Sequence, residues 1–317
     1  MRVAFFGTPA AAVPSLEAFL VAADVEVAAV VTNPDRPSGR GHRLQPPPVK
    51  VAAAEAGVDV WQPERPREIL ADLQALSLDA CAVVAYGSIL PQDVLDAGGQ
   101  GFVNLHFSLL PAWRGAAPVQ HSVLAGDTRT GVTCFVLEAG MDTGPVLTVA
   151  ETGVAADETA GDLIARLAVL GAPVLVDAVR GLVDGTLTPQ PQDHGQATYA
   201  AKITPEDARL DWAASAAQIS NAVRAFNPMP GAWTTLRGER LKVHRVALPD
   251  DADGADVAGG VAAGGAGQVI ALTEAGPVVA CGTGALVLTE VQPAGKPRMA
   301  GMDFANGYRP AGERLGG

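Results

Sequence analysis

The sequence has few of the features that mark secreted, metal-binding or membrane-spanning proteins. Only three of the 317 residues are cysteines, and Cys81, Cys134 and Cys281 lie far apart in apolar segments. They have neither the even count of a disulfide framework nor the paired spacing of a zinc site, which favours small core residues in a reducing cytoplasm and no metal. No apolar run approaches the roughly 18 residues that a membrane span requires, so we expect a globular protein without a membrane partner.

The N-terminus lacks two further signals. Gly7, Thr8 and Pro9 interrupt its apolar run where a signal peptide would continue, which predicts a first β-strand instead. The stretch FFGTPAAAVPSL then lacks the G-x-G-x-x-G spacing that brings a pyrophosphate onto a helix N-terminus. A nucleotide cofactor is therefore not expected.

Positive charge is also scarce, because the formal net charge is −12 at pH 7. This balance argues against a polyanionic partner. Most of the acidity belongs to residues 1–205, with 12 basic and 22 acidic side chains, whereas residues 206–317 have 10 and 12. One loop, PDRPSGRGHRLQPPPVK at 34–50, inverts the sign with Arg36, Arg40, Arg43 and Lys50. On composition alone, an anion-binding loop and a solvated surface loop are both open.

The first part of the chain alternates apolar runs with helical patterns, which predicts an α/β fold with a mostly parallel, doubly wound sheet. The expected strands are 2–6, 25–31, 79–85, 102–107 and 131–137. The expected helices are 13–22, 49–56, 66–76 and 116–125, followed by one or two helices over 159–184.

The pattern changes after residue 185. Periodicity is lost and Pro, Gln and Thr increase, which predicts a linker. A helix near 213–226 and five short β-like runs follow, at 231–237, 240–247, 267–272, 277–281 and 285–291. Five short strands indicate a small barrel of the OB type. We therefore expect domains at 1–185 and 207–317, joined by a linker at 186–206.

Three polar residues suggest chemistry. Asn104 and His106 interrupt the apolar run VNLHFSLLP, and positions i and i+2 of a strand share one face. Asp142 follows in the glycine-flanked turn GMDTG. An amide, an imidazole and a carboxylate suit acyl transfer between amines, in which Asn binds an oxyanion, His moves a proton and Asp supports the imidazolium. From spacing alone, purely structural hydrogen bonds remain an equal alternative.

The stretches NLHFSLLPAWRGAAP and GMDTGPVL resemble the formyltransferases that use 10-formyltetrahydrofolate. The resemblance implies that Asn104, His106 and Asp142 form the catalytic set. It also implies a folate-binding turn formed by Ser108, Leu109, Leu110 and Pro111, with 10-formyltetrahydrofolate as the formyl donor.

Within this family, the chain is most similar to the branch that formylates methionyl initiator tRNA. The similarity covers nearly the whole chain through the motifs FFGTP, PDRPSGRG, PPPVK, VVAYGSILP, WRGAAPVQ, RAFNPMPGAW and QPAGKPRM. It implies a Rossmann-like formyltransferase domain and a C-terminal OB-like barrel that binds tRNA. The basic insertion loop, with Arg40 as its main residue, would contact the acceptor stem. A monomer is expected.

Two other functions remain open from the sequence. A folate-dependent formyltransferase that acts on an amino sugar nucleotide would share the three catalytic residues, although a small acceptor needs neither the arginine-rich loop nor the C-terminal domain. A non-enzymatic folate- or RNA-binding protein would not need all three. The net charge of −2 over 206–317 is less basic than tRNA-binding domains of this family often are.

Overall fold

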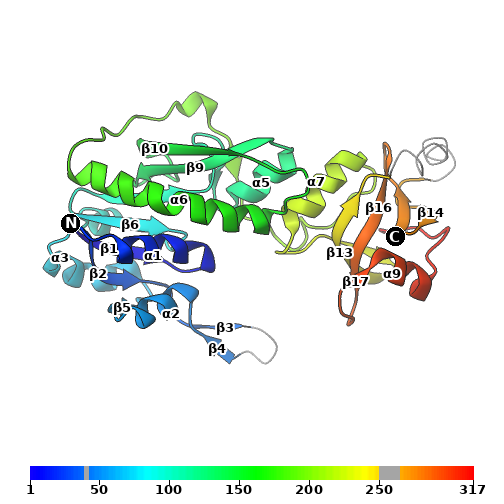
Figure 1. Cartoon of the computed structure of the whole chain (residues 1–317), viewed down its shortest axis with the longest axis horizontal. Helices are drawn as coiled ribbons and strands as arrows, with labels where there is room; N and C mark the ends of the chain where they lie inside the picture. Colours follow the sequence, from blue (N-terminus) through cyan, green and yellow to red (C-terminus); the bar gives the residue numbers. More distant parts are fainter. Residues whose placement is uncertain (39–42, 250–264) are drawn as a thin grey trace. The chain divides into compact units, whose positions relative to one another are not determined.

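The structure, a computed structural model, describes residues 1–38, 43–249 and 265–317. It contains two compact units (Figure 1). The first comprises Met1–Pro118, Arg129–Gly153 and Ile164–Ala200, and the second comprises Val119–Thr128, Val154–Leu163 and Ala201–Gly317.

The first unit is built on a seven-stranded sheet in the order β10-β9-β7-β6-β1-β2-β5. Its strands are β1 (Arg2–Gly7), β2 (Glu26–Val31), β5 (Val60–Trp61), β6 (Ala80–Val84), β7 (Phe102–His106), β9 (Arg129–Val136) and β10 (Val146–Gly153). Five adjacent strands run parallel to one another, namely β5, β2, β1, β6 and β7, whereas β9 and β10 are antiparallel to their neighbours. The four residues Val3–Phe6 of β1 are fully buried, as expected for a central strand covered on both faces. The predicted doubly wound, mostly parallel sheet is confirmed.

The winding direction reverses at β1. From there the chain builds β2 and β5 on one side and then β6 and β7 on the other. Ligands of open α/β sheets bind outside the carboxyl ends of the strands at such a switch point. This edge therefore contains the first candidate for a binding crevice.

Strand β10 is an edge strand that the apolar runs do not predict. Exposed and partly buried residues alternate along VLTVAETG from Thr148 to Gly153, and polar residues interrupt its apolar ones. Such alternation is typical of a strand that packs on one side only, and it leaves no continuous apolar run to detect.

The helices of the first part of the chain lie close to their expected positions, except for α4, which was not predicted. They are η1 (Ala10–Ala12), α1 (Val13–Val21), α2 (Pro48–Glu55), η2 (Pro66–Ile69), α3 (Leu70–Ala75), α4 (Gln92–Leu95), α5 (Pro118–Ala125) and α6 (Ala160–Val183). Helix α6 is one continuous helix of 24 residues, despite Pro173 in its interior. It approaches β7 closely at Gly171, where a Cβ would lie 2.7 Å from Leu105 Cδ2. Since strand side chains alternate, Asn104 and His106 project from the opposite face of β7.

Five short elements complete the first unit. The basic segment 34–50 forms a hairpin of β3 (Arg36–Ser38) and β4 (Arg43–Gln45) and then enters α2. The segment expected as a linker, 186–206, contains η3 (His194–Gln196) and β11 (Tyr199–Ala200). Strand β11 pairs with β8 (Arg114–Gly115). The part of the expected linker up to Ala200 therefore packs within the first unit.

The second unit contains an antiparallel half-barrel sheet in the order β12-β13-β16-β15-β14, with β17 paired to β16. Its elements are α7 (Ala216–Phe226), β12 (Trp233–Leu236), β13 (Glu239–Ala247), β14 (Val269–Thr273), β15 (Gly276–Ala280), β16 (Ala285–Pro293), β17 (Met299–Ala300) and α9 (Gly301–Tyr308). All five predicted strands are present, and the predicted barrel-like architecture is confirmed. The sequence patterns did not predict β17 or α9.

All three cysteines are buried and unpaired. Burial raises the pKa of each thiol, which keeps it protonated and unreactive. Among the helices of the described ranges, none combines the length and apolarity needed to cross a membrane.

Candidate active site

The candidate site lies at the carboxyl end of β7. This strand is held between β6 and β9, with His106 opposite Thr133 and Asn104 opposite Phe135. His106 is buried, whereas Asn104 is partly exposed. The side chain of Asn104 makes no hydrogen bond to any residue in the described part of the chain, so its amide is available to a ligand.

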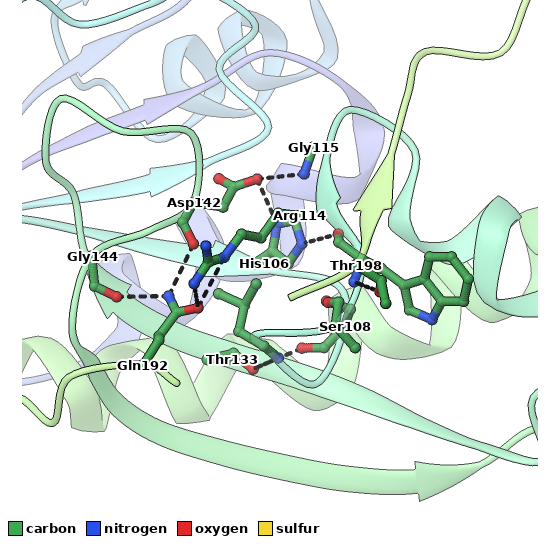
Figure 2. Close-up of polar contacts among 12 residues, drawn as sticks. His106, Ser108, Arg114, Gly115, Thr133, Asp142, Gly144, Gln192 and Thr198 are labelled. Carbon is green, nitrogen blue, oxygen red and sulfur yellow. Dashed lines mark hydrogen bonds and ion pairs between the residues drawn. The ribbon is translucent and has the colours of Figure 1, made fainter. Parts of the chain in front are cut away.

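The imidazole of His106 is held by backbone at one nitrogen. Its Nε2 lies 2.9 Å from the carbonyl oxygen of Trp113 (Figure 2). A carbonyl oxygen only accepts hydrogen bonds, so Nε2 must carry a proton. The other nitrogen, Nδ1, is the one that can gain or release a proton while the ring stays in place.

Asp142 faces that second nitrogen. Its Oδ2 lies 3.7 Å from Nδ1 of His106 and accepts a hydrogen bond of 2.7 Å from the backbone N–H of Gly115. The backbone of Asp142 has φ of +51°, in the left-handed region that residues with a Cβ rarely adopt. Such a conformation costs of order 1–3 kcal/mol and persists only where surrounding contacts hold it.

The environment of His106 changes its protonation. Burial lowers the pKa of this imidazole, and the Asp142 carboxylate and the Trp113 hydrogen bond oppose that effect without reversing it. The imidazole is therefore neutral near pH 7, with an open lone pair on Nδ1 that faces Asp142. A neutral histidine next to a carboxylate is suited to accept a proton, because the carboxylate stabilises the cation that results.

The loop 108–111 is tightly held from within the protein. The Ser108 hydroxyl donates to the carbonyl oxygen of Ala112 at 2.6 Å. Thr133 Oγ1 donates to the Ser108 carbonyl at 2.7 Å and accepts from the Leu110 N–H at 3.1 Å. The side chains of Ser108 and Leu110 are buried, whereas Leu109 and Pro111 are partly exposed. The loop is thus a rigid wall beside β7, with the Ser108 hydroxyl used inside the turn.

A second polar cluster occupies the switch point and was not predicted from the sequence. The Tyr86 carbonyl accepts hydrogen bonds of 2.7 Å from both Thr8 Oγ1 and Asn33 Nδ2. Ser88 Oγ donates to Asn33 Oδ1 at 2.9 Å. Thr8 belongs to FFGTP, and Tyr86 and Ser88 belong to VVAYGSILP, so these motifs were the only sequence signal for the cluster. Asn33, two residues after β2, had none. These residues tie together the loops that follow β1, β2 and β6.

Arg114 and Gln192 were also not predicted as site residues. Arg114 is only 2% exposed and donates to Gln192 Oε1 through Nε at 3.1 Å and through its terminal amino group at 2.6 Å. Arg114 lies within WRGAAPVQ, whereas nothing marks Gln192 in its Pro- and Gln-rich segment. Figure 2 shows both beside the His106–Asp142 pair.

The four basic residues expected to bind tRNA have different environments. Arg36 is exposed on β3. Lys50, on α2, forms an ion pair of 2.8 Å with Asp35, and this contact holds the pKa of Asp35 below its ordinary value. Arg43 belongs to β4, where its backbone pairs with Ser38. Arg40 lies outside the described residues.

A metal site is not evident in the ranges that the structure describes. They contain no group of three or more His, Cys, Asp or Glu side chains arranged to hold an ion. The three predicted catalytic residues supply an amide, an imidazole and a carboxylate at the end of β7.

Comparison with known proteins gives matches over both units. Residues 1–179 match the family described as Formyl transferase, and residues 202–309 match Formyl transferase, C-terminal domain. The chain is 49% identical to Methionyl-tRNA formyltransferase of Streptomyces coelicolor, over all of both chains.

Two solved structures share the fold. Methionyl-tRNA formyltransferase from Clostridium thermocellum has a TM-score of 0.57 at 16% identity, over 79% of this chain and 95% of that one. HypX from Aquifex aeolicus, solved in complex with tetrahydrofolic acid, has a TM-score of 0.63 at 15% identity. That match covers 99% of this chain but only 48% of the HypX chain.

Proposed function

The chain belongs to the formyl transferase family, and from this premise we propose that it formylates the α-amino group of methionyl initiator tRNA. The formyl donor is 10-formyltetrahydrofolate, and the product is formylmethionyl-tRNA for translation initiation. The observation that carries this proposal is the identity of 49% to a methionyl-tRNA formyltransferase over the full length of both chains.

Asn104 stabilises the charge that develops during the reaction. The donor supplies an electrophilic formyl carbon bonded to N10, and the formyl oxygen becomes negative as the amine attacks. The Asn104 amide is partly exposed and has no hydrogen bond within the described residues, so it can donate to that oxygen without breaking an existing bond. A preorganised donor of this kind costs little reorganisation when the charge appears.

His106 moves the proton, and Asp142 supports it. Neutral Nδ1 takes a proton from the attacking amine as the new C–N bond forms. The imidazolium that results helps to stabilise the negative oxygen, and the Asp142 carboxylate, 3.7 Å from Nδ1, favours its charge. The same proton then passes to N10 as the bond between N10 and the formyl carbon breaks, so the proton balance closes.

The loop Ser108, Leu109, Leu110 and Pro111 forms one wall of the folate site. Its internal hydrogen bonds preorganise it, so binding need not order a flexible segment. Since the Ser108 hydroxyl is used within the turn, we assign polar folate contacts here to backbone groups and apolar contacts to Leu109 and Pro111.

Arg36, Arg40, Arg43 and Lys50 contact the tRNA backbone. Arg36 is the exposed member of this set whose side chain the structure describes, and Lys50 must exchange Asp35 for phosphate. We assign formyl transfer to the domain at 1–185 and tRNA binding to the C-terminal domain at 207–317, joined by the segment 186–206, of which the part up to Ala200 packs within the first unit. The reaction takes place in the cytoplasm as part of translation, which suits three unpaired cysteines. That the protein acts as a monomer stays a prediction.

The test is transfer of labelled formyl from 10-formyltetrahydrofolate to methionyl initiator tRNA by the purified protein. We expect Asn104→Ala to lower kcat by about 10²–10³-fold while the protein stays folded. Asn104→Asp is the matched control for shape, because it keeps the size of the side chain but loses the N–H donors, and it should be equally impaired.

A near-normal rate for both variants would contradict the role of Asn104. Absence of product from folded wild-type protein and verified charged tRNA would contradict the acceptor. In that case an amino sugar nucleotide is the next acceptor to assay.

A further inference from the structure

The three consecutive residues Trp113–Gly115 reach both members of the proton-transfer pair. The Trp113 carbonyl accepts from His106 Nε2, and the Gly115 N–H donates to Asp142 Oδ2. Between these two residues, the Arg114 side chain donates hydrogen bonds to Gln192. Figure 2 shows these contacts converging from β8, the 142–144 turn and the segment around Gln192.

The contacts to Arg114 determine which way the Gln192 amide points. A guanidinium group only donates hydrogen bonds, so the atom that faces both of its nitrogens must be the Gln192 oxygen. The amide nitrogen then points the other way and donates to the carbonyl oxygens of Asp142 at 2.9 Å and Gly144 at 2.7 Å. Gln192 is 8% exposed, so water competes little for these bonds.

These two carbonyl oxygens belong to the turn that presents Asp142. They lie on either side of Thr143, so one amide group restrains the backbone both at Asp142 and beyond it. Asp142 has the unfavourable φ of +51°. Gln192 thus restrains the backbone of Asp142, whereas the Gly115 N–H restrains its carboxylate.

We propose that Gln192, oriented by Arg114, is a positioning residue that holds the Asp142 carboxylate against His106 during formyl transfer. Gln192 acts through Asp142 and does not touch the reacting atoms. This assignment rests on the proposed function for its kinetic consequences, but its geometry does not depend on the identity of the acceptor.

The kinetic test compares Gln192→Met with Gln190→Met. Methionine is neutral and similar in length but cannot donate to the turn, and Gln190 is an exposed residue of the same segment whose side chain contacts only Thr188 in the described structure. We expect Gln192→Met to lower kcat by about 10²-fold, as for a misplaced catalytic group, with KM for the folate changed less than twofold. Gln190→Met should match the wild type.

A double-mutant cycle separates positioning from general damage. In an Asp142→Asn background the carboxylate is already lost, so adding Gln192→Met should lower kcat by less than about threefold. A full 10²-fold loss in that background would overturn the proposal, as would wild-type kcat for Gln192→Met.

An NMR titration of the His106 imidazole tests the same contact without substrate. The charged and titratable groups of this cluster are Asp142, which faces Nδ1, and Arg114 and His194, which contact each other behind Gln192. Releasing Asp142 should lower the pKa of His106 in Gln192→Met relative to the wild type and Gln190→Met. An unchanged titration would overturn the proposal. If the titration shifts but the wild type formylates no tRNA, the proposed function fails and the positioning contact stands.

Gln192→Glu is the second test variant, to be used if Gln192→Met does not fold. The glutamate keeps the pairing with Arg114 but offers only an oxygen to the carbonyls of Asp142 and Gly144. We expect it to show the same kcat loss and the same near-absence of effect in the Asp142→Asn background. Wild-type kcat for this variant would also overturn the proposal.

Discussion

At the scale of single residues, three influences determine the protonation of His106. The Trp113 carbonyl places one proton on Nε2, burial favours the neutral ring, and Asp142 opposes burial. The sequence resemblance names His106 and Asp142 but does not show which influence wins. Since burial wins, the free protein holds a neutral imidazole, and in the proposed mechanism the ring becomes cationic when it takes the proton of the attacking amine.

Asp142→Asn should move the acidic limb of the pH dependence of kcat/KM to lower pH. In the proposed mechanism activity requires neutral His106, so it falls as pH drops through the pKa of His106, which burial holds below its ordinary value. Removing the carboxylate removes an influence that raises this pKa, so the limb shifts downward even though the rate also falls. Initial rates between pH 5 and 8, in about unit steps, check this.

The matched control is Asp24→Asn, which removes an exposed carboxylate that pairs with Arg180. It should leave the limb unchanged. An upward shift in Asp142→Asn, or an equal shift in both variants, would contradict the assignment of the limb to His106.

At the scale of elements, β8 and β11 hold the site through a short parallel pairing. Gly115 has φ of +123°, and a Cβ there would lie 2.6 Å from the Ala200 carbonyl oxygen. Glycine is therefore required both by its conformation and by the approach of β11. The segment around β11 looked like a linker from its composition, yet it pairs with β8, whose Gly115 donates to the Asp142 carboxylate.

Gly115→Ala should destabilise the fold by more than about 1–3 kcal/mol, the usual cost of an unfavourable backbone conformation, because backbone overlap is added to it. The control is Gly185→Ala, which has φ of +69° but no heavy atom within 4 Å of the added Cβ. Urea unfolding monitored by circular dichroism gives both values. Equal losses of unfolding free energy in the two variants would show that the close approach of β11 adds nothing to the cost of the backbone conformation.

Helix α7, which the sequence predicts near 213–226, begins with a capping box that no sequence pattern indicated. Ser215 Oγ accepts from the Gln218 N–H at 3.3 Å, and Gln218 Oε1 accepts from the Ser215 N–H at 3.0 Å. Ser215→Ala should lower the free energy of unfolding of its unit by about 0.5–2 kcal/mol, and Ser215→Gly by only a few tenths. Thermal unfolding of the two variants checks the order, and a larger loss for glycine would contradict it.

At the scale of the whole molecule, an acidic protein contains one short segment rich in positive charge. The net charge is −12, but the hairpin β3–β4 and the start of α2 contribute Arg36, Arg43 and Lys50 from one short segment. Because local potential steers a polyanion more than net charge does, an acidic protein can still bind tRNA there.

Arg36→Ala should weaken binding of initiator tRNA and reduce the slope of log affinity against log salt by about 1, the effect of one lost phosphate contact. Lys50→Ala should have a smaller effect, because Asp35 already neutralises that lysine. Arg129→Ala, which removes an exposed arginine paired with Glu151, is the control and should leave the slope unchanged. A wild-type slope in Arg36→Ala would remove this residue from the tRNA site.

The sequence by itself determined the fold class, the positions of the main strands and helices, and the family. Apolar runs and helical periodicity are local properties, so they can be detected without knowing what packs where. The quoted motifs likewise singled out Asn104, His106 and Asp142, whose roles stay predictions. Sequence patterns missed β10, since an edge strand with one exposed face has no continuous apolar run.

Only the tertiary structure decided how the site is held. Gln192 lies 50 residues from Asp142 and 78 from Arg114, and no periodicity links positions so far apart. The same holds for the tautomer and the lowered pKa of His106, which depend on the Trp113 carbonyl and on burial. Hydrogen bonding and desolvation depend on distances in space, and the packing of distant segments sets those distances.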